Sequence, residues 1–597
     1  MKKTALGLAF GLALSSSVAA AQSVEMEGSL PAVGERQVAQ PALRLADRTI
    51  SPVIALAAAI EAAPGELDAI ADWNRAGREP ARIGFARPLL EGMRVDFAAG
   101  APDPATRSGE AASHAGGLLA RGVAGELVWG ARFEVADAYR LRLHLTEVEL
   151  PAGTQMWVYG GGNELVAFGL ELLSEEERSL WTPSIGGGVI HLEVQVPAGS
   201  EGADNAGSFV LADVAEIFQL DPAGRPLVGV SPAPSHDLSC LVDAQCITPA
   251  TFDVIDLVQQ AIARLQFMVG SSVAVCSGGL LNDTVPATAI PFFQTANHCI
   301  STQSVTNTLE AFWDYYAPSC GAPWPNLGSL PRSNGGMLLA TGESSDFSLL
   351  RLHSIPPNRA FLGWNADPAA VPHGTVLHRV SHPLGFAQAY SRTLVNVNAP
   401  VCSGVSRPGF LYQTSDLGGT QVGSSGSPVI LPGGFMVGQL AGLCGPEPSE
   451  GCNPANRTVD GAFSESFSGE VPFLTGTGFT PCVPSPTSLC LHNNRFRVEV
   501  DWETASGEGD GVVLTKLSDA SGVFYFFNPS NAEMLVKVLN ACVPPFNRYW
   551  VFFAATTNVE FTVTVTDTQA DVTKNYFNPL GRAALPIQDT QAFATCP

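Results

Sequence analysis

Three short segments of this chain carry side chains that together could cleave a peptide bond. The first is the run Gly423-Ser-Ser-Gly-Ser-Pro428. A nucleophilic serine needs an exposed hydroxyl and backbone N–H groups that face the developing oxyanion. A tight turn with a glycine two residues before the serine and another directly after it allows both. Ser425 is therefore the candidate nucleophile, and the N–H groups of Gly423 and Ser425 are the candidate oxyanion hole.

The other two segments supply a base and an acid. His298 lies in Thr295-Ala-Asn-His-Cys299, just after an apolar run, where a neutral imidazole can take the serine proton. Asp346 begins an apolar strand, and a carboxylate beside an imidazole fixes its tautomer and stabilises the imidazolium. Each segment alone also fits a structural role. Their order, His298, Asp346 and Ser425, within one β-patterned region predicts a serine peptidase triad.

All twelve cysteines lie in the later part of the chain, none before residue 240. In an exported chain this number indicates disulfides, and no CxxC pair or cysteine–histidine spacing indicates zinc. The first part of the chain is therefore expected to fold without covalent cross-links.

The N-terminus is typical of a signal peptide. Lys2 and Lys3 precede the apolar run 5–14, and small residues up to Ala21 form a cleavage site. No later apolar stretch is long enough to span a membrane. The formal net charge of −24 argues against nucleic acid as a partner, because phosphate binding needs basic surfaces. A secreted protein is expected.

Alternating patterns dominate the chain on both sides of the triad region. In 139–146 the leucines alternate with Arg140, Arg142 and His144, and 189–196 repeats the pattern around His191. Such segments predict half-buried strands of a small β-sandwich, with both histidines on the solvent side. The segment after 489 alternates in the same way and predicts a second sandwich.

The middle of the chain resembles the bacterial lysyl endopeptidase group of chymotrypsin-like serine peptidases. The resemblance covers roughly 239–467 and is carried by short motifs around the cysteines, the triad and the later strands. They are Ser239-Cys-Leu-Val-Asp-Ala-Gln-Cys246, Cys276-Ser-Gly-Gly-Leu-Leu-Asn282, Thr295-Ala-Asn-His-Cys299, Phe312-Trp-Asp-Tyr-Tyr-Ala-Pro-Ser-Cys320, Ser345-Asp-Phe-Ser-Leu-Leu350, Gly363-Trp-Asn365, Val380-Ser-His-Pro383, Gly423-Ser-Ser-Gly-Ser-Pro428 and Val437-Gly-Gln-Leu440. The family implies a double β-barrel with the active site between the barrels.

The resemblance also implies three disulfides and the roles of the flanking regions. The bridges are Cys276–Cys299, Cys246–Cys320, and Cys240 with either Cys444 or Cys452. The β-patterned part before residue 221 looks like the pro-region of such peptidases, which would assist or inhibit the peptidase. The Pro- and Gly-rich joint after it and the absence of cysteines before it predict cleavage near Arg225. The last segment resembles an accessory domain of exported bacterial proteins.

The chain therefore divides into six segments of an all-β protein, a chymotrypsin-like double β-barrel between two β-sandwich-like domains. They are a signal peptide at 1–21, a flexible, partly helical pro-segment at 22–110 with a short helix at 54–62, a β-rich pro-domain at 111–220, a linker at 221–238, the peptidase domain at 239–480 and the C-terminal β domain at 487–597.

The specificity pocket departs from the family pattern. Lysine-specific members hold an aspartate at the base of the primary pocket, and here Thr458 falls at that position, with Asp460 two residues later. A shift of two residues would move the charge by about 6–7 Å, too far for a lysine ammonium. Ala441, in Gln439-Leu440-Ala441, replaces a family histidine. The sequence therefore does not predict cleavage after lysine. The candidate pocket residues are Gln439, Leu440, Ala441, Thr458 and Asp460. Asp460 is either a pocket base or, more simply, a surface loop residue, and a pocket for small or apolar side chains is equally compatible.

No cofactor or metal is predicted. His353, His373, His378 and His382 fit no compact zinc motif and are interpreted as structural or surface residues. A further group of four carboxylates lacks calcium-loop spacing and is interpreted as a solvated turn. The group comprises Asp501, Glu503, Glu508 and Asp510.

Two functions are compatible with these patterns. The first is a secreted serine endopeptidase that acts on protein or peptide substrates through a His-Asp-Ser triad and an acyl-enzyme. The alternative is a catalytically silent exported binding or adhesion protein built on a peptidase scaffold. The complete triad favours the enzyme, because a silent scaffold has no physical reason to keep all three groups.

Overall fold

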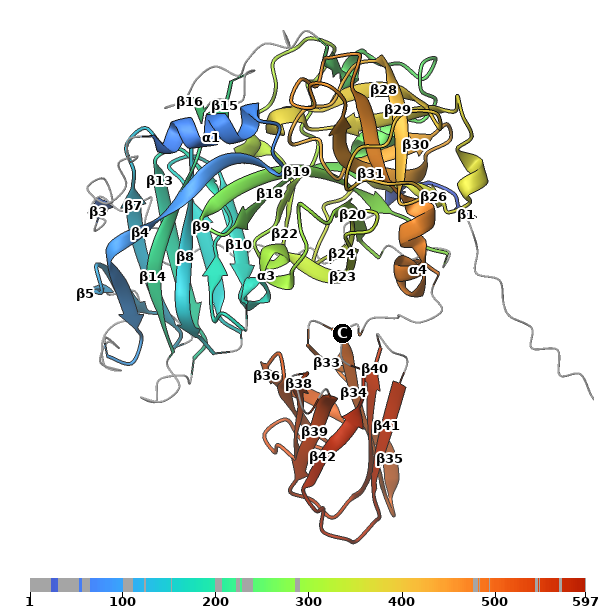
Figure 1. The fold of residues 1–597 in the computed structure, drawn as a ribbon. Helices are drawn as coiled ribbons and strands as arrows, with labels where there is room; N and C mark the ends of the chain where they lie inside the picture. Colours follow the sequence, from blue (N-terminus) through green and yellow to red (C-terminus); the bar gives the residue numbers. More distant parts are fainter. Residues whose placement is uncertain are drawn as a thin grey trace, which may run out of the picture.

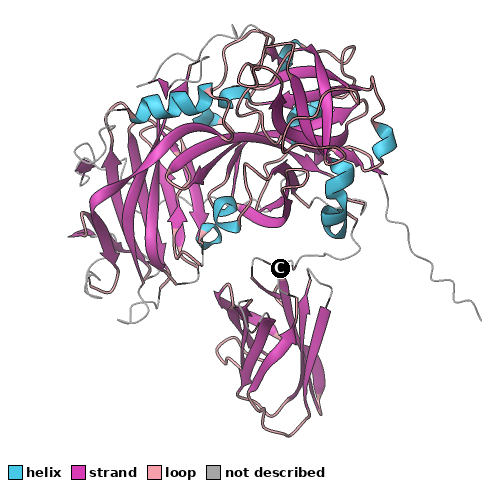
Figure 2. Cartoon of the chain, in the orientation of Figure 1, coloured by secondary structure: helices cyan, strands magenta, loops and turns pink. Residues whose placement is uncertain are grey.

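The computed structural model is built almost entirely of β-strands (Figure 2). It describes residues 23–30, 53–55, 65–99, 111–122, 125–151, 153–174, 176–198, 207–221, 226–227, 240–284, 290–475, 482, 484–492, 494–542, 546, 548–568 and 572–595. The predicted signal peptide and the joint around Arg225 lie outside these residues. None of the described helices is long and apolar enough to cross a membrane.

The first barrel of the peptidase unit is half open. Its strands run in the order β22-β21-β18-β19-β20-β24-β23, and among the described pairings none joins β22 to β23. The strands are β18 (Ile262–Val269), β19 (Ser272–Leu281), β20 (Phe292–Ala296), β21 (Glu310–Phe312), β22 (Arg332–Asn334), β23 (Gly336–Gly342) and β24 (Phe347–Leu352). Leu265, Phe293 and Trp313 belong to the buried apolar core of this barrel.

The second barrel is closed. Its order is β31-β30-β27-β28-β29-β32, and β31 also pairs with β32, which completes a ring of six strands. The strands are β27 (Val376–Ser381), β28 (Ala389–Val395), β29 (Phe410–Leu417), β30 (Pro428–Leu431), β31 (Phe435–Cys444) and β32 (Arg457–Ala462), followed by α4 (Phe463–Leu474). The expected double-barrel fold is confirmed.

The N-terminal region forms a β-sandwich, as expected. One sheet runs β10-β9-β13-β7-β6-β5 and the other begins β11-β8-β14-β4, with a large apolar core between them. The strands are β4 (Ala81–Asp96), β5 (Ala111–His114), β6 (Gly117–Arg121), β7 (Leu127–Glu134), β8 (Arg140–Glu149), β9 (Gln155–Tyr159), β10 (Leu165–Gly169), β11 (Leu180–Trp181), β13 (Val189–Val196) and β14 (Ser208–Ile217). Leu141, Leu143 and Leu145 are fully buried in this core.

The sandwich and the first barrel share one continuous sheet (Figure 1). β4 pairs with β14 of the sandwich along most of its length, and its first residues pair with β19 of the barrel. Further upstream, β1 (Ser23–Val24) pairs with β26 (Gly363–Asn365), and β2 (Glu27–Leu30) pairs with β25 (Arg359–Phe361). The expectation of a flexible pro-segment is therefore wrong for these strands, because peptidase strands satisfy their backbone hydrogen bonds.

The expected helix at 54–62 is also corrected. Val53–Ala55 forms β3, which pairs in parallel with β7, and residues 56–62 lie outside the described residues. The helix of this region is α1 (Glu66–Arg75), directly before β4. The prediction followed alanine content, whereas the observed helix has buried apolar residues on one side and acidic residues in its first turn.

The two histidines placed on the solvent side are covered. His191 is 3% exposed and stacks on Tyr159, while His144 stacks on Trp181 and contacts Asp213 at 2.6 Å. Strand alternation was correctly predicted around them. The second face of these strands is partly covered, because neighbouring side chains of the sandwich and, at Arg142, the peptidase unit pack against it.

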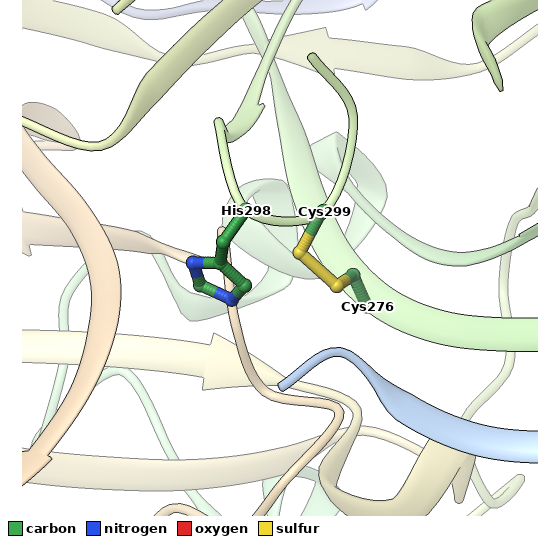
Figure 3. A group of neighbouring side chains, drawn as sticks. All are labelled: Cys276, His298 and Cys299. Carbon is green, nitrogen blue, oxygen red and sulfur yellow. A yellow bond between two sulfur atoms is a disulfide. The ribbon is translucent and has the colours of Figure 1, made fainter. Parts of the chain in front are cut away.

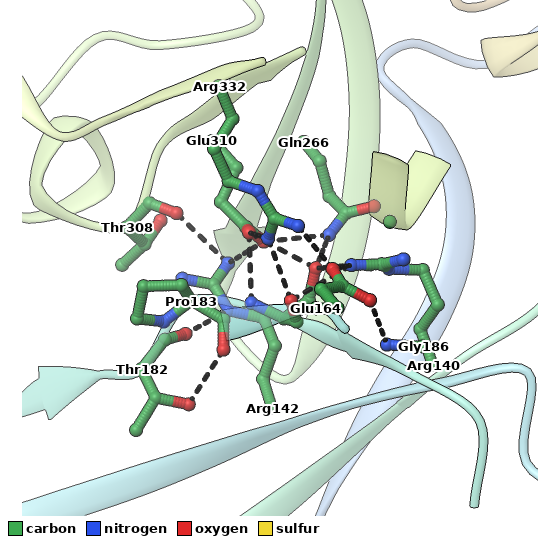
Figure 4. A network of polar contacts seen from close by, with 12 residues as sticks. Arg140, Arg142, Glu164, Thr182, Pro183, Gly186, Gln266, Thr308, Glu310 and Arg332 are labelled. Atoms are coloured by element: carbon green, nitrogen blue, oxygen red, sulfur yellow. Dashed lines mark hydrogen bonds and ion pairs between the residues drawn. The ribbon is translucent and has the colours of Figure 1, made fainter. Parts of the chain in front are cut away.

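Arg140 and Arg142 show the same effect most clearly, because each is 1% exposed. Figure 4 shows them in a polar network that joins the sandwich to the first barrel. Arg140 pairs with Glu164 at 2.7 Å, and Arg142 lies 3.7 Å from Glu310 of the barrel. Arg332 of the barrel pairs with both carboxylates. Burial alone would raise the pKa of Glu164, but Arg140 and Arg332 lower it to about 2.

The C-terminal domain is a second sandwich, as expected, with its core between two sheets. One sheet comprises β33 (Leu489–Leu491), β34 (Phe496–Thr504), β35 (Gly507–Asp510), β40 (Glu560–Asp567) and β41 (Val572–Asn578). The other comprises β36 (Val512–Ser518), β37 (Ser521–Tyr525), β38 (Met534–Ala541), β39 (Arg548–Ala555) and β42 (Ile587–Phe593).

Disulfides tie the peptidase unit together. The two implied bridges Cys276–Cys299 and Cys246–Cys320 are confirmed, and the partner of Cys240 is Cys452. Cys444 pairs instead with Cys402, and Cys482 pairs with Cys490.

Candidate active site

His298 and Asp346 meet at the end of the first barrel. His298 follows β20 and Asp346 precedes β24, and these strands pair, so both residues lie at the same sheet edge. The Asp346 carboxylate accepts the His298 backbone N–H at 2.9 Å and contacts Nδ1 at 2.7 Å. Burial lowers the pKa of His298, but the Asp346 carboxylate outweighs it, so the pKa is raised. The dyad can therefore hold Nε2 toward a nucleophile and stabilise the imidazolium.

The backbone of Asp346 is held in an uncommon conformation. Its φ is 50°, in the left-handed region that non-glycine residues adopt at a cost of about 1 kcal/mol. Three contacts hold it there: its carbonyl accepts the Asn297 N–H at 3.0 Å and the Gln439 amide at 3.1 Å, and its own N–H donates to Glu343. Gln439, predicted as a pocket residue, thus supports the dyad from behind.

A second layer of buried polar groups lies behind Gln439. Gln294 donates to Glu470 of α4 at 3.3 Å and to Gln439 at 3.5 Å. Burial raises the pKa of Glu470 to about 7, although contacts with Ser466 and Gln294 lower it. Gln294 and Glu470 could not be predicted from the sequence, because a glutamine in a strand and a glutamate in a helix carry no catalytic pattern.

Ser425 lies in the tight turn before β30. Gly423 and Gly426 have φ of 91° and 78°, which only glycine adopts readily. A Cβ on Gly426 would also collide with Thr295 and Ser277. The Ser425 carbonyl accepts the Ser277 N–H at 2.8 Å, so the turn is attached to β19 of the first barrel. The turn therefore places Ser425, the predicted nucleophile, between the two barrels.

The Ser425 hydroxyl and the outer nitrogen of His298 converge on a residue that the sequence analysis missed. Three buried polar atoms have no hydrogen-bond partner among the described residues: Oγ of Ser425, Nε2 of His298 and Oε2 of Glu79. Glu79 precedes β4 of the N-terminal sandwich. A lone glutamate before Pro80 carries no sequence signal, so only the fold could place it here.

The cysteines beside His298 are structural. The candidate ligand atoms of Cys276, His298 and Cys299 lie within 4.8 Å of one another, but Figure 3 shows the two cysteines joined as a disulfide. A disulfide sulfur is not the thiolate that binds a metal. The bridge ties the loop that carries His298 to β19.

The candidate pocket residues lie on β31 and β32, which pair with each other. Leu440 and Thr458 are buried and Ala441 is half-buried. Asp460 is fully buried, which corrects its interpretation as a surface loop residue. Its carboxylate meets Arg379 of β27 at 2.5 Å and accepts a hydrogen bond from Gln413. Its charge is therefore neutralised inside the second barrel.

The remaining histidines and acidic residues have ordinary environments. His378 stacks on Phe252, and His382 is buried and contacts the Phe386 carbonyl. His353 is half-buried and His373 is exposed. In the C-terminal domain, the four carboxylates Asp501, Glu503, Glu508 and Asp510 line an open groove. The structural interpretation of the histidines agrees with these contacts.

Comparison with known proteins supports one family. Residues 236–456 match the family described as lysyl endopeptidase, C-terminal domain, and residues 122–206 match lysyl endopeptidase, N-terminal domain. A lysyl endopeptidase of Pseudomonas aeruginosa is 30% identical over 339 residues, which cover 55% of this chain and 69% of that protein.

Solved structures of proteases give distant matches. The active form of the Rv3671c protease from M. tuberculosis matches with a TM-score of 0.26 and 14% identity, over 41% of this chain and 92% of that one. The MamO protease domain from Magnetospirillum magneticum matches with a TM-score of 0.24 and 16% identity, over 36% and 96%.

Proposed function

The chain belongs to the lysyl endopeptidase family, and from this premise we propose that it is a secreted serine endopeptidase with Ser425 as its nucleophile. The observation that carries the proposal is the contact of His298 Nδ1 with Asp346 at 2.7 Å, which leaves the buried Nε2, like the Ser425 hydroxyl, without a partner among the described residues. The family supports a peptidase activity, and this geometry supports the serine mechanism.

The reaction follows from the roles of these groups. His298 accepts the Ser425 proton as Oγ attacks the scissile carbonyl, and the N–H groups of Gly423 and Ser425 stabilise the oxyanion. His298 then protonates the leaving amine, and water attacks the acyl-enzyme by the reverse route. Asp346 keeps the imidazole in the required tautomer and stabilises its charged form.

The N-terminal sandwich acts, in this proposal, as a pro-region that assists folding or inhibits the peptidase. Its strand β4 extends the sheet of the first barrel, and its Arg142 completes a buried charge network with Glu310. Cleavage at the joint near Arg225 would release it. The disulfides of the peptidase unit fit an oxidising compartment and support secretion.

The pocket supports a preference other than lysine. Asp460 already pairs with Arg379, so it cannot offer a free carboxylate to a lysine ammonium. We expect cleavage after small or apolar residues. The peptide products formed from an unbiased peptide library would measure this preference. Dominant cleavage after lysine would contradict this preference.

The serine mechanism is tested by labelling the processed, secreted protein with a fluorophosphonate. Wild type is expected to be labelled at Ser425, and Ser425→Ala is expected to show no labelling. A processed wild-type protein without Ser425-dependent labelling would overturn the proposal and favour a silent binding scaffold.

A further inference from the structure

The segment between α1 and β4 crosses the candidate active site. Downstream, Ala81 pairs with Val275, the neighbour of Cys276, whose disulfide leads to the loop of His298. Upstream, Gly77 lies against Ser449 of the second barrel, since a Cβ on Gly77 would be 2.9 Å from the Ser449 Cα. Residues 78–80 therefore span the space between the two barrels, over the nucleophile.

The Glu79 side chain points into the catalytic centre. Its buried carboxyl oxygen Oε2 has no hydrogen-bond partner among the described residues. The carboxyl group lies close enough to the Ser425 hydroxyl, the Gly423 N–H and His298 for each of them to lower its pKa. Gly423 N–H is one of the two proposed oxyanion-hole donors. A carboxyl oxygen here takes the position that the substrate oxyanion needs.

The segment is held rigidly in this position. Trp73 of α1 donates to the Pro80 carbonyl at 2.9 Å, and Asn74 makes two hydrogen bonds with the Arg82 backbone at 2.8 and 2.9 Å. The Arg82 guanidinium stacks on Trp73 at 3.5 Å. Because these contacts fix both sides of Glu79, little conformational entropy is lost when its carboxyl group binds.

We propose that the oxyanion hole of this protein is a carboxyl-binding site, and that in the uncleaved chain its ligand is Glu79 of the N-terminal region. The proposal rests on the proposed serine mechanism and adds the means by which the pro-region inhibits. The side chain, rather than a backbone carbonyl, fills the hole, so the segment blocks the nucleophile without presenting a bond for attack.

The protonation of this contact gives it a pH dependence. Burial raises the pKa of Glu79 to about 7, although His298, Ser425 and Gly423 lower it, and Asp346 adds to the rise. Glu79 in turn raises the pKa of His298. On its own segment, the charged neighbours Arg78 and Arg82 both stack on Trp73. Docking therefore takes up a proton, so the contribution of Glu79 is full below about pH 4.5 and is lost as pH rises through about 7.

The test uses the full chain and compares its uncleaved and processed forms after fluorophosphonate labelling on one gel. In wild type, we expect the uncleaved form to be labelled at least tenfold more slowly than the processed form. Glu79→Ala is expected to bring the two rates within threefold. Asp72→Ala is the control, because it changes an exposed side chain of α1, and it should leave the wild-type ratio of the two labelling rates unchanged.

A conservative variant covers the case in which Glu79→Ala does not fold. Glu79→Gln keeps the shape, resembles the protonated carboxyl group and cannot titrate. For wild type we expect the rate of the uncleaved form, divided by that of the processed form, to rise between pH 5 and 8. For Glu79→Gln we expect this ratio to stay near the wild-type value at pH 5 and to be independent of pH.

The possible results separate the two proposals. If neither form is labelled, the serine mechanism itself fails. If the processed form is labelled but Glu79→Ala stays as slow as wild type at every pH, or the folded Glu79→Gln shows the same dependence on pH as wild type, the backbone alone covers the nucleophile, and the role of the Glu79 carboxyl group is overturned.

Discussion

The N-terminal sandwich contacts the peptidase unit through two buried polar regions that differ in how their charges are balanced. At the network of Arg142, Glu164 and Glu310, every carboxylate faces arginines and is ionised far below neutral pH. At the candidate active site, one of the described groups that act on Glu79 can become a cation, and this group is His298. The first contact is thus suited to hold the domains together and the second to be released.

The largest effect is expected from a change in the contact between Asp346 and His298. Asp346→Asn keeps the size of the side chain but favours the wrong imidazole tautomer, and we expect a loss of about 10⁴-fold in kcat of the processed protein. The turnover of a peptide substrate measures this. Activity within tenfold of wild type would show that Asp346 does not orient His298.

The second largest effect is expected from a change in the buried charge network around Glu310, which should lower the stability of the uncleaved chain. Glu310→Ala leaves Arg142 buried without its carboxylate, and we expect a loss of about 3–5 kcal/mol in the stability of the uncleaved chain. Thermal unfolding of the uncleaved chain measures the change. The matched control is Glu147→Ala, which removes an exposed ion pair with Arg94 and should cost under about 1 kcal/mol. Equal effects of the two variants would contradict the structural role of the network.

The smallest expected effect is a difference in pH dependence between the Glu79 contact and the Glu164 contact. A shift of the Glu79 pKa from 4.5 to about 7 corresponds to roughly 3 kcal/mol at most of contact free energy that is lost on passing from acid to above neutral pH. Glu164, whose pKa is about 2, gives a contribution that is present above about pH 4.5 and lost only as pH falls through about 2.

Hydrogen exchange of the uncleaved chain separates these two contacts. After correction for intrinsic rates, we expect the amides around residue 79 to lose protection between pH 5 and 8, while those of β8 keep theirs. Equal loss at both places would show that the domains separate as a unit, with no special weakness at the catalytic centre.

The proposed catalytic groups could be identified as candidates from the sequence because their requirements are local. Ser425 needs a glycine turn, and His298 and Asp346 each stand at the end of a strand, so short segments reveal all three. The disulfide partners of Cys276 and Cys246 followed from the family resemblance. The distance between the triad members was settled only by strand pairing, since β20 and β24 bring His298 and Asp346 together.

Other residues were misread for one shared reason. Strand alternation showed that Arg140 and His191 point away from the sandwich core, but it cannot show whether the opposite face meets water or another part of the chain. Asp460 was similarly taken for a surface residue, although Arg379 from a distant strand covers its charge. In each case a long-range contact decided the environment.

The sequence by itself determined the strand pattern, the cysteine-rich unit and the three candidate groups of the proposed triad, because turns, alternation and local motifs depend on neighbouring residues. Only the tertiary structure decided which charges are buried and which residue fills the active site. Glu79 reaches Ser425 because β4 pairs with β19, and such pairing depends on the whole sheet.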